Sequence, residues 1–321
     1  MKHVVDKNFF PGFTRKALTF TIDDGDVIND KKFIDIVRPM GIRGTFNICD
    51  VTAISPEEYR ELYRGFEIAN HVYLHPRVFL IGENPPLCDK ILDTSDADPK
   101  LFYRCSAHGG VWYFHGSYYV PDVYDNKPTA WFRITDPETY VELMRESHRR
   151  IESVFGEGSV KSFVWPFGRQ EDCERILQGV GELGYNSARD AGKVPANPDF
   201  SMPSDRMNWK YCATQSTLLD NMKAFEALPD DGELKLFAFG VHSIDYEKCD
   251  RWGDLAQFAE LYGKRPDDFY YSTVSEAFEY EDAIAACIVT DSKIINDSDK
   301  TLYIKIDGVP ITLQAGSVIG I

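Results

Sequence analysis

Short runs of β-forming residues alternate with helical patterns over most of the chain, and this alternation limits the possible folds more than any other feature. The predicted strands lie at residues 17–22, 43–48, 66–69, 161–165, 185–188, 235–240 and 269–271. Alternating strands and helices are typical of parallel sheets in which helices make the crossovers. The sequence therefore predicts an α/β fold built on a parallel βα barrel or sheet.

Two helix starts support this interpretation. Residues 55–58 read SPEE and residues 135–138 read TDPE, and each combines a hydroxyl cap, a nearby proline and a later glutamate. Beyond the second start, six residues recur on one face of an expected amphipathic helix: Tyr140, Leu143, Met144, Ser147, Ile151 and Val154.

Two regions break the alternation. Residues 77–134 have no clean period, so we expect a long inserted loop region there. In the tail, Leu302, Ile304 and Ile306 alternate with polar residues before an Asp-Gly turn, a pattern typical of a hairpin. The expected organisation is one barrel domain over residues 1–287, with the insertion, and a small antiparallel β appendage over residues 288–321.

Composition excludes several classes of partner. No apolar run reaches the length of a membrane span, so membrane insertion is not expected. The net charge of -16 repels phosphate backbones, so nucleic acid is not expected either. Seven scattered cysteines and the lack of a signal-like start favour a cytoplasmic location, although a secreted chain already freed of its signal would look the same. The sequence does not decide whether the protein forms a homo-oligomer.

Two short motifs carry residues suited to chemistry. The first strand runs into Asp23 and Asp24 in TFTIDDG, and the third is followed by His71 and His75 in NHVYLHP. Histidines four apart on a helical turn point to one side and suit a single metal ion. Each motif also has a plain structural explanation: a tight Asp-Gly turn, and two packed or surface histidines.

Position in the predicted sheet favours the chemical explanation. Asp23, Asp24, His71 and His75, together with Phe167, Arg189 and His242, all follow predicted strands. The carboxyl ends of parallel strands are where barrels and open α/β sheets build their active sites. One aspartate and two histidines suit a catalytic metal, with a second carboxylate to take a proton from water and a histidine to protonate a leaving group.

With these motifs the sequence resembles the polysaccharide deacetylases of carbohydrate esterase family 4, whose domain is an irregular (β/α)7 barrel of the TIM type. TFTIDDG resembles the first family motif, Thr-Phe-Asp-Asp-Gly, which implies that Asp23 is the general base and Asp24 a metal ligand. NHVYLHP resembles the second motif, which implies that His71 and His75 complete the metal site. The resemblance covers residues 15–282.

Two further motifs extend the resemblance. FVWPFG, which contains Trp165 and Phe167, resembles the third motif, which lines the substrate groove and lends a backbone N–H to the oxyanion, here that of Phe167. FGVHSID resembles the fifth motif, which implies that His242 is the general acid.

Two departures from the family pattern bear on the mechanism. Val164 stands where the third motif has an arginine that pairs with the base, and Arg189 is the candidate replacement, although a structural salt bridge would also explain it. Val72 replaces the hydroxyl residue between the two histidines, which removes a hydrogen bond that fixes the loop.

The predicted function is a metal-dependent hydrolase that removes the acetyl group from an N-acetylated sugar or polysaccharide, through a metal-activated water. Zinc is the first choice of metal, and cobalt, nickel or iron would suit the same ligands. Two alternatives remain: a cytoplasmic amidohydrolase of a small linear or cyclic amide, and a non-catalytic carbohydrate-binding barrel.

Overall fold

The computed structural model describes residues 3–73, 75–78, 103–104, 111–115, 118–121, 132–134, 137–169, 174–190, 194 and 196–321. Internal contacts divide the chain into two compact units. The first comprises Met1–Phe46, Glu61–Glu67 and Lys193–Ile321, and the second comprises Asn47–Arg60 and Ile68–Gly192.

A seven-stranded sheet carries the fold. Its strands are β2 (Lys16–Asp24), β3 (Thr45–Ile48), β4 (Glu67–Asn70), β10 (Ser162–Val164), β11 (Ser187–Arg189), β12 (Lys235–His242) and β13 (Tyr270–Tyr271). Their order is β11-β10-β4-β3-β2-β12, with β13 also paired to β2. The pairs β10–β11, β10–β4, β12–β2 and β13–β2 are parallel. All seven predicted strands are present, and this curled half-barrel confirms the predicted α/β fold of the irregular (β/α)7 type.

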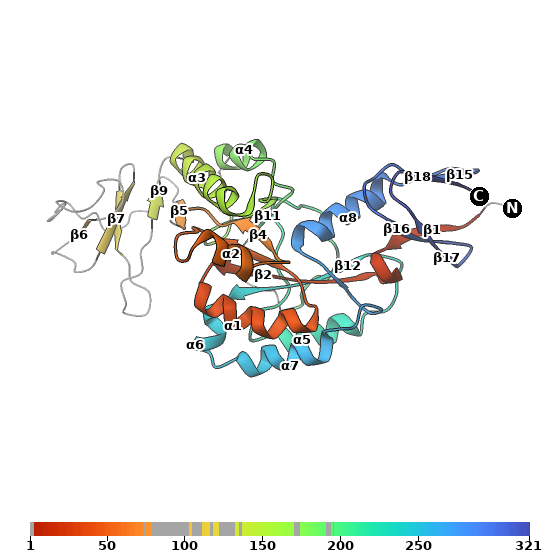
Figure 1. Ribbon diagram of the computed structural model, residues 1–321, viewed down its shortest axis with the longest axis horizontal. Coiled ribbons are helices and arrows are strands. Elements are labelled where there is room, and N and C mark those ends of the chain that lie inside the picture. The colour runs from red at the N-terminus through yellow and green to blue at the C-terminus, as the bar shows by residue number, and fades with distance from the viewer. Residues whose placement is uncertain are drawn as a thin grey trace. The chain divides into compact units, whose positions relative to one another are not determined.

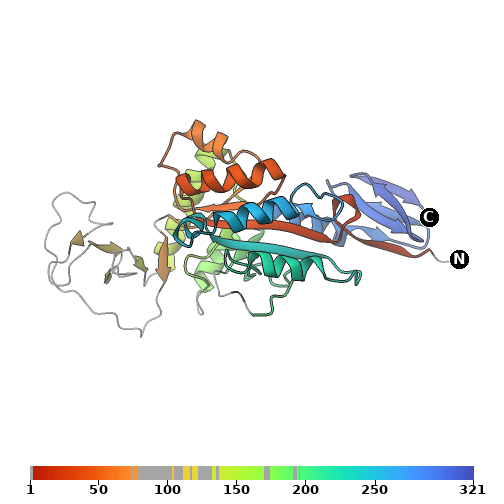
Figure 2. The same cartoon turned by 90° about the horizontal axis from the view of Figure 1, so that it is seen from below.

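In the first unit, β2 is buried from Ala17 to Asp23, as expected for a parallel strand covered on both faces. β12 pairs with it along its whole length. Helices lie along these two strands in Figures 1 and 2: α1 (Val27–Val37), α5 (Leu218–Glu226), α6 (Ser243–Lys248) and α7 (Trp252–Tyr262). The rings of Phe20, Phe33 and Phe239, with centroids 4.9–6.2 Å apart, join strands to helix in the core.

The first unit also holds short 3-10 helices, a long helix and two antiparallel sheets. These elements are η1 (Pro11–Phe13), η2 (Arg38–Met40), α8 (Val274–Ala286), β1 (Val5–Phe9), β14 (Ile288–Val289), β15 (Lys293–Asn296), β16 (Leu302–Ile306), β17 (Val309–Leu313) and β18 (Ser317–Gly320). The predicted hairpin is present: Asp307 and Gly308, both at positive φ, join β16 to β17.

The sequence did not indicate the N-terminal strand of these sheets. β1 pairs antiparallel with β16, so the two ends of the chain share a sheet in the order β1-β16-β17. The other sheet has the order β14-β15-β18. These antiparallel strands agree with the predicted β appendage, whereas a domain boundary at residue 287 stays a prediction.

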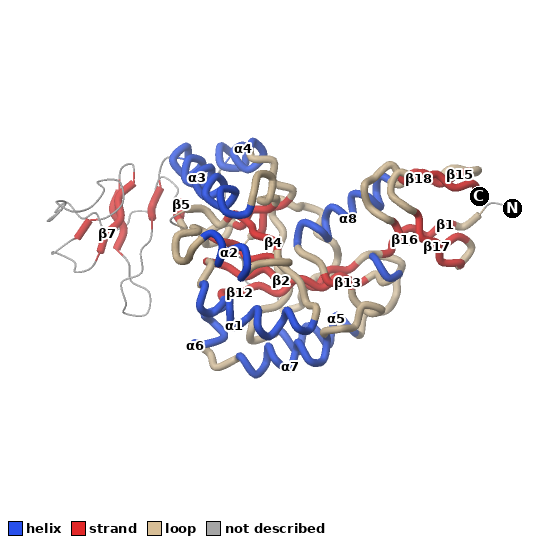
Figure 3. The backbone as a smooth tube through the Cα atoms, viewed as in Figure 1, coloured by secondary structure: helices blue, strands red, loops and turns tan. Residues whose placement is uncertain are grey.

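The second unit contains β10, β11, α3 (Pro137–Phe155) and α4 (Glu174–Glu182), with most of β4 and most of α2 (Pro56–Leu62). The predicted apolar face of α3 is confirmed, since all six of its residues are at most 9% exposed. The predicted cap of α2 is also confirmed: Ser55 Oγ accepts from Glu58 N, and Ser55 N donates to the Glu58 carboxylate. Figure 3 shows these helices and strands by type.

Within the predicted insertion the structure describes five short strands. β5 (Pro76–Val78) pairs parallel with β9 (Phe132–Ile134). β6 (Tyr103–Arg104), β7 (Val111–His115) and β8 (Tyr118–Pro121) form an antiparallel sheet. The rest of residues 79–131 lies outside the described residues. Among the helices of the described part, none is long and apolar enough to cross a membrane.

Candidate metal centre

β2 ends in the two adjacent carboxylates. Asp23 is 6% exposed and closes the buried run, whereas Asp24 is exposed. Asp24 and Gly25 both have positive φ, at 77° and 72°. This conformation reverses the chain, and glycine adopts it without steric cost. The turn predicted from Asp-Asp-Gly is therefore real, and it brings the two carboxylates into different surroundings.

His242 lies beside these carboxylates at the end of β12. In the parallel pairing of the two strands, His242 is the partner of Asp23. His242 Nδ1 lies 2.9 Å from Asp245 Oδ2, and its Nε2 lies 3.5 Å from Asp24 Oδ2. A carboxylate that accepts from Nδ1–H holds the ring so that Nε2 faces away from it. His242 therefore presents Nε2 to the end of β2.

The surroundings of His242 also set its protonation. Burial lowers its pKa, but the hydrogen bond with Asp245 and the charges of Asp24 and Asp23 outweigh burial and raise the pKa to about 9. The imidazole is therefore protonated at neutral pH and can donate a proton. A cation at Asp24 would offset part of this negative charge and bring the pKa closer to neutrality.

The two histidines after β4 face one another. His71 is 1% exposed, and its Nδ1–H donates to the Val164 carbonyl over 3.0 Å. This bond makes Nε2 the acceptor nitrogen of the ring, the arrangement usual for a metal-binding histidine. His75 Nε2 lies 3.1 Å from His71 Nε2. Two nitrogens on one tetrahedral zinc, each at about 2.0–2.1 Å, lie about 3.3 Å apart, so this pair is close to the spacing that a shared ion needs.

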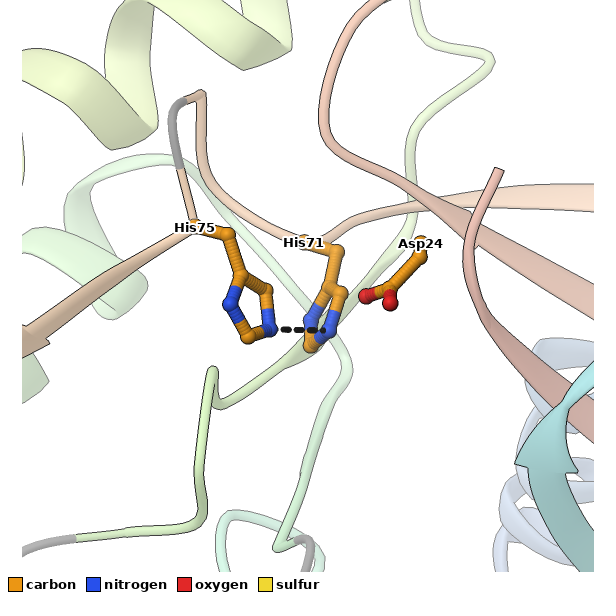
Figure 4. A group of neighbouring side chains, drawn as sticks. All are labelled: Asp24, His71 and His75. Atoms are coloured by element: carbon orange, nitrogen blue, oxygen red, sulfur yellow. Dashed lines mark hydrogen bonds between the residues drawn. The ribbon is translucent and has the colours of Figure 1, made fainter. Parts of the chain in front are cut away.

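Asp24 completes the group. One ligand atom from each of Asp24, His71 and His75 lies within 4.8 Å of the others. Figure 4 shows the carboxylate and both imidazoles directed toward one region. A carboxylate with two imidazoles leaves positions for water and substrate, as in catalytic zinc sites. The three residues therefore fit a divalent cation, and they do not by themselves select which one.

Backbone strain gathers at this group. Positive φ is uncommon outside glycine, and four residues at or beside this group have it: Asp24 at 77°, Val72 at 59°, His75 at 46° and Phe167 at 60°. Such conformations cost about 1–3 kcal/mol each and persist only where the surroundings hold them. Strain of this kind is frequent at sites where side chains must be aimed.

The third-motif residues occupy the turn after β10. Trp165 is 2% exposed, and its backbone N–H donates to the Arg189 carbonyl over 3.0 Å. Phe167 is 38% exposed, and its ring lies edge-on to His75 with centroids 4.4 Å apart. The structure therefore places Phe167, rather than Trp165, as a surface ring beside the histidines.

Arg189 is fully buried at the end of β11. One of its contacts is a hydrogen bond from Nη1 to the Asp190 carbonyl, 3.3 Å long. Its role as the partner of Asp23 stays a prediction.

Sequence reasoning missed two residues that orient this group. Asp245 holds His242, and the His-x-x-Asp spacing at a helix start was the available signal. Asn70 directly precedes His71, and its side chain accepts from the backbone N–H of Val72 over 2.8 Å. Only the Asn-His dipeptide pointed to it in the sequence.

The family model described as Polysaccharide deacetylase matches residues 12–188, which is more than half of the chain. No curated protein matches in sequence.

Solved structures of several carbohydrate esterases are similar to this chain. A family 4 carbohydrate esterase from Streptomyces lividans has 12% identity and a TM-score of 0.41, covering 76% of this chain and 86% of its own. The chitin deacetylase of Colletotrichum lindemuthianum has 14% identity and a TM-score of 0.43, covering 85% and 89%. A peptidoglycan deacetylase from Bacillus subtilis has 13% identity and a TM-score of 0.42, covering 83% and 93%. By the extent of the family match, the chain belongs to the polysaccharide deacetylase family of carbohydrate esterase family 4.

Proposed function

We propose that this protein removes the acetyl group from an N-acetylated sugar, and so cleaves an amide bond that is not a peptide bond. Membership of the family implies deacetylation of acetylated carbohydrates. The observation that supports the finer proposal is the convergence of Asp24, His71 and His75 on one ion-sized region. His242 and Asp23 lie level with each other at the ends of β12 and β2.

The proposed roles follow from the position of each side chain. A divalent cation held by Asp24, His71 and His75 would polarise the acetyl carbonyl and lower the pKa of the attacking water. Asp23 would accept a proton from that water, and His242 would donate one from Nε2 to the departing nitrogen. The water oxygen is added to the acyl carbon as the carbon–nitrogen bond breaks, which releases acetate and a free amine.

The turn after β10 would complete the site. The backbone N–H of Phe167 would donate to the oxyanion, and the exposed ring of Phe167 would contact the sugar. Trp165 would stabilise this turn, because its carbonyl accepts a hydrogen bond from Gly168 N over 3.1 Å. Zinc is the proposed ion, and cobalt, nickel or iron would suit the same ligands.

Acetate release from N-acetylglucosamine oligomers, with and without a chelator, tests this function. We expect chelation to remove almost all of the activity, and added zinc to restore it. Asp24→Asn should lose both the metal and the activity. The control is Asp35→Asn, since Asp35 is an exposed carboxylate of α1 with an ion pair to Lys31. Full activity in Asp24→Asn, or turnover that a chelator leaves unchanged, would overturn the proposal.

One observation favours a second substrate class. Position 164 holds a valine where the family motif has an arginine, so the site lacks that positive charge. Val164 is 2% exposed, and its backbone carbonyl contacts a proposed metal ligand, His71. A site with this difference suits a small linear or cyclic amide as a second candidate. Assaying such amides beside the oligomers separates the two, and binding of oligomers without turnover of any amide would indicate a non-catalytic barrel.

A further inference from the structure

The loop that carries the two metal-binding histidines has an unusual backbone. Val72 is fully buried with φ at 59°, and His75 has φ at 46°. For a β-branched residue such as valine, positive φ is a genuine outlier. The loop closes through a hydrogen bond from His75 N to the Val72 carbonyl, 3.0 Å long. Contacts outside the loop must therefore hold this shape.

Asn70 makes the first of these contacts. It is fully buried, and its Oδ1 accepts from Val72 N over 2.8 Å. Its amide group donates to the Met144 carbonyl over 2.8 Å and to Tyr185 Oη over 2.7 Å. One side chain thus links the strained loop to α3 and to the residues before β11. It also holds the backbone at Val72, where the family has a hydroxyl side chain.

Tyr185 supports Asn70 in turn. It is 3% exposed, and its Oη lies 2.9 Å from His148 Nδ1. Because Oη accepts from Asn70, its own proton goes to His148, whose Nε2 lies 3.3 Å from Glu152 Oε1. Burial raises the pKa of Tyr185 far above its ordinary value, so it remains a donor. The tyrosine ring is stacked on Phe163 with centroids 5.7 Å apart.

We propose that Asn70 and Tyr185 are positioning residues for the metal-binding loop. Through them, the hydrogen bonds that run from His148 to Tyr185, Asn70 and the backbone of Val72 hold Val72 at positive φ. His71 and His75 then face each other before a cation arrives. The inference rests on the proposed metal site, and it concerns the affinity of the site rather than the substrate. Partners behind the ligands of a metal typically change its affinity by about 10- to 100-fold.

Zinc titration of the full chain by calorimetry tests this inference. Tyr185→Phe removes one oxygen and keeps the ring on Phe163, so we expect a folded protein whose Kd for zinc rises by about 10-fold. Asn70→Ala should raise it by up to about 100-fold. The matched control is Tyr280→Phe. Tyr280 is buried, like Tyr185, but its hydroxyl donates to the Thr301 carbonyl in the C-terminal part of the first unit. Its Kd should stay within about twofold of the wild type.

The double variant shows whether the two residues act together. If Tyr185 acts through Asn70, the double variant should bind zinc no more weakly than Asn70→Ala alone, because coupled residues are not additive. Independent, additive losses would overturn the proposed route, and an unchanged Kd in Tyr185→Phe would overturn the inference. Should Asn70→Ala fail to fold, Tyr185→Phe still decides.

Two further readouts separate this inference from the proposed function. The visible absorption of the cobalt-loaded protein reports ligand geometry, and it should change in Tyr185→Phe but not in Tyr280→Phe. A wild-type chain that binds no zinc would refute the metal site itself. A wild-type chain that binds zinc and loses affinity in these variants would support positioning, even if no N-acetylated sugar were hydrolysed.

Discussion

His242 and Asp245 are joined within a single helix turn. Nδ1 of the histidine lies 2.9 Å from Oδ2 of the aspartate, and the two residues are the N-cap and third residue of α6. Local helix geometry therefore sets the direction of the imidazole. The proposed acid is oriented by a residue of its own element, three positions along the chain.

Replacing Asp245 by asparagine should weaken the acid without removing it. The hydrogen bond of Asp245 and its charge help to raise the pKa of His242 to about 9, so the variant should lose protonated imidazole at lower pH. We expect kcat to fall by about 10- to 100-fold and the alkaline limb of the kcat/KM profile to move to lower pH. The pH–rate profile of the zinc-loaded protein measures both.

Asp254→Asn is the matched control for this change. Asp254 forms an i,i+3 ion pair with Arg251 near the start of α7, and it is not among the carboxylates that raise the pKa of His242. It should leave the profile in place. If Asp245→Asn also left the alkaline limb unmoved, His242 would not be the proton donor.

Much of the fold and of the site was predictable from local sequence. Each of three β-forming runs leads directly into a candidate site residue: Asp23, His71 and His242. Locating the end of each strand therefore located the site residue as well. The apolar face of α3 repeats with the helical period and is buried as predicted. These features depend on neighbours within a few positions.

What escaped prediction depends on contacts between distant residues. β1 pairs with β16, about three hundred positions along the chain, and nothing local in its sequence marks that partner. The contact of Tyr185 with His148 and Asn70 likewise joins α3, β4 and the segment before β11. Asparagine, tyrosine and histidine have many possible partners, so only the fold shows which they meet.

Asp30 offers a prediction about pH and stability. It is fully buried in α1 and accepts from Tyr63 Oη over 2.6 Å. Burial raises its pKa to about 7; the hydrogen bond from Tyr63 opposes this rise, and the nearby carboxylates of Asp26 and Asp24 add to it. Between its ordinary value of 3.8 and about 7, the unfolded chain has lost a proton that the folded chain keeps. Stability contributed by this group therefore falls as pH rises through that window.

Asp30→Asn keeps the shape of the side chain and removes its ionisation. Relative to the wild type, its free energy of unfolding should increase by about 2–3 kcal/mol from about pH 5 to about pH 8. Urea unfolding of both proteins in chelator, at the two pH values, measures this difference. The exposed Asp35→Asn variant should show almost none of it, and a difference independent of pH in Asp30→Asn would contradict the raised pKa.

Gly308 tests the hairpin that joins β16 to β17. Its φ is 81°, and an added Cβ would meet nothing within 4 Å, so only backbone strain opposes a side chain. Gly308→Ala should lower the free energy of unfolding by about 1 kcal/mol. Gly253, in α7, is equally open but lacks positive φ. Gly253→Ala should raise the free energy of unfolding by about 0.5–1 kcal/mol. If both variants changed thermal stability equally, the positive φ of Gly308 would not be what opposes a side chain there.

Zinc should stabilise the folded chain, because the ligands converge only after folding. Asp24 ends β2 and His71 directly follows β4, 47 positions along the sequence, so the unfolded chain does not present them together. A ligand at one hundred times its Kd that binds only the folded state adds about 2.7 kcal/mol. For a chain of this size that is an increase in Tm of about 5 °C. Differential scanning calorimetry with excess zinc measures this increase in Tm.

Magnesium at the same concentration should have little effect on Tm, because it prefers oxygen ligands. His75→Ala should abolish the zinc shift, since one imidazole of the pair is then gone, and a shift that survives in this variant would place the bound ion elsewhere.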